Sequence, residues 1–257
     1  MIARTKEEIE IIRESGRRLG HHLARLSAMV VAGVTPRDID TAAMQMIADD
    51  GDVAPFHHYP SGRQGEKFPG VICVSTNDII VHAPGNWDET PFQEGDIVTI
   101  DFGVQHRGLI TDSARTIIVG KPRNPEEAAM VSSAYEALQL GIDQARIGNT
   151  TGDIGYAIQR IAESRGYGYP LNLSGHGVGR EVHEEPHVPN YGDPGKGTKL
   201  VEGLVIAIEP MFTMGKGDVY VTKDNFTYKT KDGSRACHVE HTVLITKEGP
   251  EILTRDN

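Results

Sequence analysis

The chain has 257 residues, of which 38% are hydrophobic, and a formal net charge of −10 at pH 7. This length and composition suit a globular protein with a full core, and no apolar run approaches the ~20 residues of a membrane-spanning helix. The negative charge argues against nucleic acid as the main ligand, and two widely separated cysteines argue against a disulfide framework or a cysteine zinc site.

The N-terminal part of the chain predicts a pair of helices. Its first residues include acidic side chains and no apolar secretion signal, which predicts a cytoplasmic protein. Thr5 followed by Glu8 is a capping box, and apolar residues then recur at helical spacing up to Val30. A second helix is predicted from Pro36, a residue that suits the first helical position, to Gly51.

After the loop predicted for residues 53–70, the chain alternates strands and helices. Residues 71–75 and 79–82 are rich in β-branched side chains and predict two strands. Residues 97–113 predict a hairpin with its turn at 106–108. A third helix is predicted after Asn124 and a fourth from about Thr150. From Gly166 onward we expect strands, turns and glycine-rich loops.

An internal repeat relates the two halves of the sequence. Three pairs of segments correspond in the same order: 33–39 with 148–154, Gly51 with Gly166, and 94–101 with 202–209. Each half therefore has a helix pair followed by a strand that ends in an acid, Asp101 or Glu209. We predict one α+β domain over residues 1–257, made of related halves of about 1–120 and 121–257, with a carboxylate from each half pointing to one place.

Several acidic and imidazole side chains occupy positions that need an explanation. Asp101 and Asp112 each lie inside an apolar strand, where a carboxylate is costly unless it is paired, hydrogen-bonded or bound to a metal. Hydrogen bonds from a turn or from Arg115 are an open structural alternative for either residue alone. Glu209 ends a third apolar strand and Glu240 lies within a fourth.

Taken together, these residues predict a metal centre. Singly, His176 among glycines also suits a hydrogen-bonding loop residue, His183 a turn cap, and Glu240 a surface acid. Four strand-borne acids that converged would repel one another, and divalent cations remove that repulsion. Carboxylates can bridge two ions, so the set predicts two metals ~3.5–4 Å apart. Such a ligand set suits Mn, Fe, Co or Zn.

In these motifs the chain resembles the type I methionine aminopeptidases of metallopeptidase family M24. The motifs match in order and spacing over nearly the whole chain: the Asp101 and Asp112 hairpin, residues 175–179, 183–186 and 208–211, and Glu240-His-Thr. The resemblance implies the pita-bread fold, an antiparallel sheet covered by two helix pairs with internal pseudo-two-fold symmetry. It also implies hydrolytic removal of the N-terminal methionine from nascent proteins and peptides, favouring a small second residue.

The resemblance also implies a role for individual residues. It assigns two divalent ions to Asp101, Asp112, His176, Glu209 and Glu240. Glu209 is further implied to act as general base, His183 to stabilise the oxyanion or hold the scissile carbonyl, and His82 to contact the substrate near that amide. Phe68, Cys73 and Phe226 are candidates for the lining of the methionine pocket, and plain core packing is an equally open explanation for these three.

Three segments depart from the pattern of that family. Residues 83–87 follow His82 where the family has His-Gly-Ile-Pro, residues 56–67 read as an insertion, and Val182 replaces an aromatic residue. These departures concern the shape of the methionine pocket and leave the metal set intact.

Two rival functions are compatible with the same fold. Xaa-Pro aminopeptidases and prolidases have the same fold, but usually carry an extra N-terminal domain and Arg-Ile-Glu-Asp at the last ligand, where this chain has His-Val-Glu240-His-Thr. A scaffold protein that has lost catalysis is disfavoured because the ligand set is complete. We expect nascent polypeptide N-termini as partners, a monomer, and neither a membrane nor a direct nucleic-acid contact; ribosome docking is left open.

Overall fold

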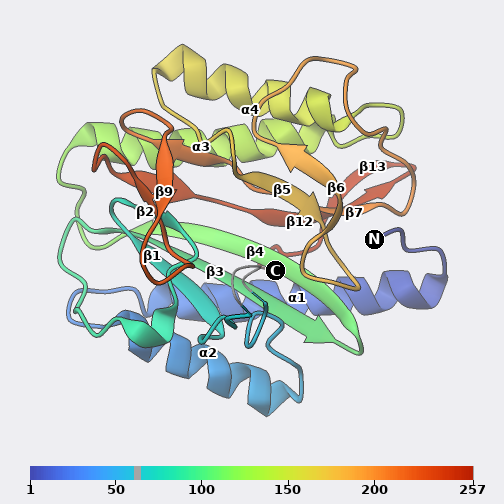
Figure 1. The fold of residues 1–257 in the computed structure, drawn as a ribbon. Coiled ribbons are helices and arrows are strands. Elements are labelled where there is room, and N and C mark those ends of the chain that lie inside the picture. Colours follow the sequence, from blue (N-terminus) through green and yellow to red (C-terminus); the bar gives the residue numbers. More distant parts are fainter. Residues whose placement is uncertain (61–64, 257) are drawn as a thin grey trace.

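Two helix pairs enclose the strands in the computed structural model, which describes residues 1–60 and 65–256 (Figure 1). Helices α1 (Lys6–Ala28) and α2 (Pro36–Asp50) lie on one side, and α3 (Pro125–Gln144) and α4 (Thr151–Arg165) lie on the other. All four begin where the capping residues predicted. Among the described residues, no helix is long and apolar enough to span a membrane.

The matching helices α2 and α4 begin and end in the same way. Capping boxes start both, formed by Thr35 with Asp38 and by Thr150 with Asp153. Both end at a glycine in the left-handed conformation, Gly51 with φ 69° and Gly166 with φ 75°, where a side chain would be strained. The repeat therefore reflects equivalent local structure at both ends of these helices.

The strands pair antiparallel, and most belong to two main sheets. The first has the order β1-β3-β4, comprising β1 (Ile72–Thr76), β3 (Ile97–His106) and β4 (Leu109–Ile118). The second has the order β13-β12-β7-β5-β6, comprising β13 (Gly249–Ile252), β12 (His241–Thr246), β7 (Val205–Ile208), β5 (Ser174–Gly177) and β6 (Glu184–Pro189). The predicted hairpin joins β3 and β4 through Arg107 and Gly108, both at positive φ as a two-residue turn of this kind needs.

Shorter strands form the remaining ladders. One has the order β2-β10-β9, with β2 (Ile79–Val81), β10 (Tyr228–Thr230) and β9 (Val219–Val221). The other pairs β8 (Met211–Thr213) with β11 (Ala236–His238). A short 3-10 helix, η1 (Gly85–Trp87), follows β2.

Each helix pair packs its apolar face on its own sheet. Leu19 and Leu23 of α1 share a core with Ile100 and Phe102 of β3, and all four are fully buried. On the other side, Ala134 and Leu138 of α3 share a second core with strand β7 and its neighbours. Full burial of a large apolar side chain contributes about 1.5–3 kcal/mol, so the two cores hold the helices on the sheets.

Between the two sheets, side-chain hydroxyls replace a regular ladder. Thr242 Oγ1 donates to the carbonyl oxygen of Asp112 at 2.7 Å and accepts from its amide at 2.9 Å. Ser113 Oγ donates to the carbonyl oxygen of Glu240 at 2.7 Å, and the Glu240 amide donates to Ala114 at 3.0 Å. The predicted antiparallel architecture is confirmed, and this seam fixes the backbones of two acids from opposite halves.

Candidate metal centre

The five predicted metal ligands converge at the seam between the sheets. They come from different elements: Asp101 from β3, Asp112 from β4, His176 from β5, Glu209 from the end of β7, and Glu240 from just before β12. None is more than 7% exposed. All five line one cavity of about 370 Å³, together with His82 and His183. The structure thus brings together the five predicted ligands and both histidines to which the resemblance gave a role.

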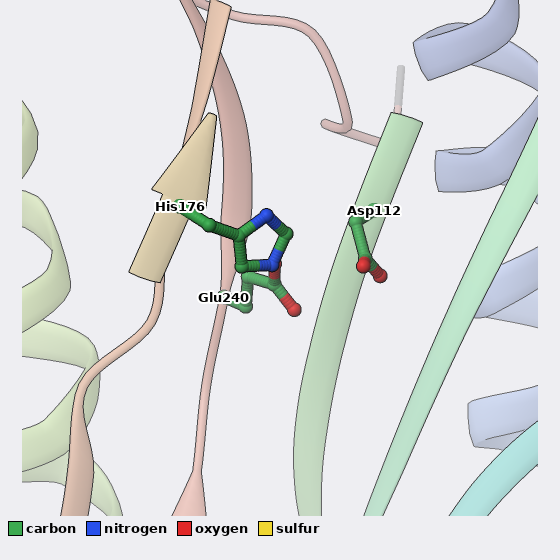
Figure 2. Close-up of side chains that lie close together, drawn as sticks. All are labelled: Asp112, His176 and Glu240. Carbon is green, nitrogen blue, oxygen red and sulfur yellow. The ribbon is translucent and has the colours of Figure 1, made fainter. Parts of the chain in front are cut away.

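Three of these side chains are close enough to share one cation. The ligand atoms of Asp112, His176 and Glu240 all lie within 4.8 Å of one another, and Figure 2 shows the three side chains pointing toward a common space. His176 Nδ1 lies 2.9 Å from the carbonyl oxygen of Gly177, so Nδ1 carries the hydrogen and donates it. Nε2 is then the nitrogen with a free lone pair, as a metal ligand needs.

The buried acids lack the partners that would stabilise their charges. Burial, and then repulsion from Asp101 and Glu209, raise the pKa of Asp112 well above its ordinary value. Burial and the neighbouring acids likewise raise the pKa of Glu240. Within the described residues, one carboxylate oxygen each of Asp101, Asp112 and Glu240 is buried without a hydrogen-bond partner.

Orphaned oxygens of this kind fit a cation site. Burial of an unpaired carboxylate is costly, and a divalent ion removes both the desolvation penalty and the mutual repulsion. The structural alternative of an arginine partner finds no support, because in residues 1–60 and 65–256 Arg115 forms no ion pair with Asp101 or Asp112. The donor set of carboxylates with one imidazole therefore fits divalent metals.

Glu209 lies between two imidazoles. Its Oε1 is 3.5 Å from His176 Nε2, and its Oε2 is 3.2 Å from His238 Nε2. The Asn190 side-chain amide donates to the Glu209 carbonyl oxygen at 2.9 Å and holds its backbone. Sequence reasoning gave His238 no role, and its position two residues before Glu240 was the available signal, although the structure ends β11 at His238 and leaves Glu240 outside any strand.

Two further histidines face the cavity in neutral form. His82 follows β2 at φ 64°, and its ring meets Tyr228 edge-on with centroids 5.5 Å apart. Burial, reinforced by His183 and His238, lowers the pKa of His82 to about 3. The His183 ring lies 4.4 Å from that of His176, and burial lowers the pKa of His183 as well. Neutral imidazoles can donate hydrogen bonds to a substrate at neutral pH.

The rest of the cavity wall is largely apolar. Phe68, Cys73 and Phe226, the candidates for the methionine pocket, are among its lining residues, and Phe68 meets Phe226 edge-on with ring centroids 5.6 Å apart. The same three residues belong to a buried hydrophobic cluster, so they both pack the core and face the cavity. Burial raises the pKa of Cys73 well above its ordinary value, which keeps it a neutral thiol. Sequence reasoning gave no role to two other lining residues, Asn225 and Tyr228, and tied Val182 and the segment 56–67 only to the shape of the pocket.

Comparison with known proteins shows which family the chain belongs to. A model of metallopeptidase family M24 matches residues 10–247. The chain belongs to this family. Methionine aminopeptidases from Clostridium acetobutylicum and Aquifex aeolicus are 39% and 41% identical to it, covering 99% and 97% of this chain and 98% and 97% of theirs. The predicted family is thereby confirmed, and this M24 member is a metallopeptidase that uses divalent metal.

Solved structures of other M24 members confirm the pita-bread fold. The crystal structure of methionine aminopeptidase from Thermotoga maritima matches with a TM-score of 0.93 and 38% identity, covering 100% of both chains. A prolidase from Pyrococcus horikoshii matches less closely, with a TM-score of 0.76 and 25% identity, and this chain covers 64% of that one. The similarity is therefore greater to the methionine aminopeptidase than to the prolidase.

The three departures from the M24 aminopeptidase pattern all lie at the apolar wall. After His82, helix η1 brings Trp87 against Phe226, with ring centroids 5.8 Å apart. The predicted insertion at 56–67 contributes Phe56, Tyr59 and Pro60 to the cavity, while its residues 61–64 lie outside the described part of the chain. Val182 also lines the cavity, with a smaller side chain than an aromatic residue.

Proposed function

We propose that this M24 peptidase is a methionine aminopeptidase that holds two divalent ions and releases the N-terminal methionine of nascent proteins and peptides in the cytoplasm. One observation carries the proposal: the five predicted ligands line one cavity together with two histidines and a set of mostly apolar and aromatic side chains. Such a cavity combines a hydrolytic centre with a pocket for one apolar side chain. The proposal includes a preference for a small second residue.

The ligand set divides between two ions. Asp112, His176 and Glu240 are close enough to hold the first. Asp101 and Glu209, which line the same cavity, would help to hold a second. Carboxylates with a single imidazole suit Mn, Fe, Co or Zn. When bound, the metals would lower the pKa of a bound water toward neutrality and polarise the scissile carbonyl.

The residues of the chain supply the proton transfers and the orientation of the substrate. Glu209 accepts the proton of the attacking water and passes it to the leaving amine, as a general base and then acid. His183 hydrogen-bonds the oxygen of the scissile carbonyl as negative charge develops there. His82 contacts the amide from the opposite half of the chain. Phe68, Phe226 and Cys73 enclose the methionine side chain, whose sulfur packs well against aromatic rings.

One assay tests this function against both rivals. The purified protein is stripped of metal, reloaded with Mn or Co, and offered the peptide Met-Gly-Met and an Xaa-Pro dipeptide in parallel. We expect methionine release from the first peptide and no cleavage of the second. Preferential cleavage of the Xaa-Pro peptide would identify a prolidase, and failure to cut either peptide would identify a scaffold without catalysis.

A further inference from the structure

A tyrosine from the loop before β1 contacts a histidine of the cavity. Tyr59 Oη lies 2.7 Å from His183 Nδ1, and the two rings meet edge-on with centroids 5.1 Å apart. These residues are 124 positions apart in the sequence and come from opposite halves of the chain. Both line the cavity that holds the metal ligands. A hydrogen bond at this place acts on a group that faces the substrate.

The backbone on both sides of Tyr59 is held by hydrogen bonds. The Tyr59 amide donates to the Phe56 carbonyl oxygen at 2.9 Å, and the Phe68 amide donates to the Tyr59 carbonyl oxygen at 2.9 Å. The amide of His58 also donates to the Phe68 carbonyl oxygen at 2.9 Å. Because its main chain is fixed on both sides, Tyr59 presents its hydroxyl to His183 in a defined place.

The chemistry of the pair decides which atom carries the hydrogen. Burial raises the pKa of Tyr59, so its phenol keeps its proton and can donate it to the ring nitrogen 2.7 Å away. A phenol is the stronger acid of the two and an imidazole nitrogen the stronger base, so the hydroxyl donates to Nδ1. Nδ1 of a neutral ring that accepts a hydrogen bond has no hydrogen of its own. The single ring hydrogen is then on Nε2.

We propose that Tyr59 is a positioning residue that holds His183 in the tautomer with hydrogen on Nε2, so that this nitrogen donates to the carbonyl oxygen of the substrate. Among the described residues, no hydrogen bond engages Nε2, which leaves it free for a substrate. The opposite tautomer would present a lone pair to the carbonyl oxygen and repel it. This inference rests on the role proposed above for His183.

The tautomer is measured directly by NMR on zinc-loaded protein labelled with ¹⁵N-histidine. We expect the wild-type protein to show His183 with a protonated Nε2 and an unprotonated Nδ1, and Tyr59→Phe to show a mixture of tautomers. A protonated Nδ1 in the wild-type protein would overturn the proposal. This measurement needs no turnover, so it decides the tautomer even if methionyl peptides are not cleaved, an outcome that would count against the proposed function alone.

Kinetics then separate positioning from a role in pocket shape. Tyr59→Phe keeps the ring, so we expect kcat to fall about fivefold to tenfold, the effect of one hydrogen bond, with KM for Met-Gly-Met changed by less than about twofold. In a His183→Ala background the same substitution is expected to cause no further loss. An additional loss in that background, or an unchanged kcat in the single variant, would contradict the proposal. Tyr169→Phe is the matched control, because the Tyr169 hydroxyl donates to Glu163 outside the cavity.

Discussion

The two halves of the molecule contain equivalent strand pairs, but these pairs carry different side chains at one corresponding position. In the first half β1 pairs with β3, and Ser75 lies opposite Thr99. In the second half β5 pairs with β7, and His176 lies opposite Ala207, the residue that corresponds to Thr99 in the repeat. An imidazole thus stands where the first half has a hydroxyl. The repeat supplies two equivalent places for acids, and the difference between the halves supplies the one imidazole of the candidate ligand set.

The corresponding acids Asp101 and Glu209 also differ in their surroundings. Both are 7% exposed, but Asp101 has a buried oxygen without a partner in the part of the chain that the structure describes. Glu209 instead faces two imidazoles, at 3.5 Å and 3.2 Å. The first half therefore contributes an acid suited to metal binding alone. The second half contributes an acid that can also exchange protons, and this asymmetry can be tested residue by residue.

The largest expected effect follows from exchanging each of these acids for its amide. Glu209→Gln removes a proposed ligand that is also the proposed general base, so we expect loss of metal and a fall in kcat/KM of about 10³-fold or more. Asp101→Asn removes a ligand only, so one ion per chain and some turnover should remain. Metal content by mass spectrometry after dialysis, and hydrolysis of Met-Gly-Met, measure both. A Glu209→Gln enzyme that kept two ions and full turnover would refute the role given to this residue.

A smaller effect is expected at the two histidines that face the cavity from opposite halves. His82→Ala and His183→Ala should each retain metal, because neither belongs to the ligand set, and each should slow the reaction by about 10²-fold. His82 is already neutral across the working range, since its pKa lies at about 3. Substituting it should therefore leave the pH dependence of kcat/KM above pH 5 unchanged. Loss of metal from the His82 variant would show that the division between ligands and substrate contacts is wrong.

The two halves also differ in how one corresponding helix position contacts the neighbouring backbone. Asp40 of α2 accepts hydrogen bonds from the amides of Val71 at 2.8 Å and Ile72 at 3.4 Å. The matching residue of α4 is Gly155, where an added Cβ would lie 2.3 Å from the Tyr191 carbonyl oxygen. One half ties its sheet to the helix with a carboxylate, and the other lets the backbone approach directly.

Substitutions at this position should each cost about 1–3 kcal/mol of unfolding free energy, for different reasons. Asp40→Ala leaves two buried amides without an acceptor, and Asp40→Asn should be milder because an acceptor oxygen remains. Gly155→Ala forces the backbone beside Asn190 to move, and so should also lower kcat. Urea denaturation and peptide hydrolysis measure both. Ser164→Ala, at an exposed position of the same helix, is the control; an equally large effect there would exclude this explanation.

Features that depend on residues close together in the sequence were predictable, whereas contacts between distant residues were not. The helix starts were found because a capping box such as Thr5 with Glu8 lies within four residues. The buried acids could be singled out as candidate ligands because an acid in an apolar strand is costly wherever the strand lies. Tyr59 was missed because its loop has no periodicity and its partner is 124 positions away. The hydroxyl seam at Thr242 was missed for the same reason, since its bonds to Asp112 join residues 130 positions apart.

The smallest expected effect concerns a buried histidine that only the first helix pair contains. His22 of α1 is 2% exposed, and its Nε2 lies 3.1 Å from Asp50 Oδ2, whereas the sequences of α3 and α4 have no histidine. Burial lowers the pKa of His22 in the folded state, an effect that the Asp50 carboxylate opposes but does not cancel. In the unfolded chain this histidine titrates near its ordinary pKa of about 6.5.

The sign of the pH effect follows from that difference. As the pH falls below about 6.5, His22 takes up a proton in the unfolded state but not in the folded state, so the free energy of unfolding decreases. This decrease continues until the pH reaches the folded-state pKa of His22. Above about pH 6.5, His22 does not change the free energy of unfolding. Urea denaturation at pH 7.5 and 5.5 should show a smaller decrease in His22→Gln than in the wild type. His21→Gln, at an exposed neighbouring position, should behave as the wild type. Amide hydrogen exchange at pH 5.5 should then be faster in α1 and α2 than in α3 and α4. Equal exchange rates in both helix pairs would mean that the loss of stability at acidic pH does not arise in the first half.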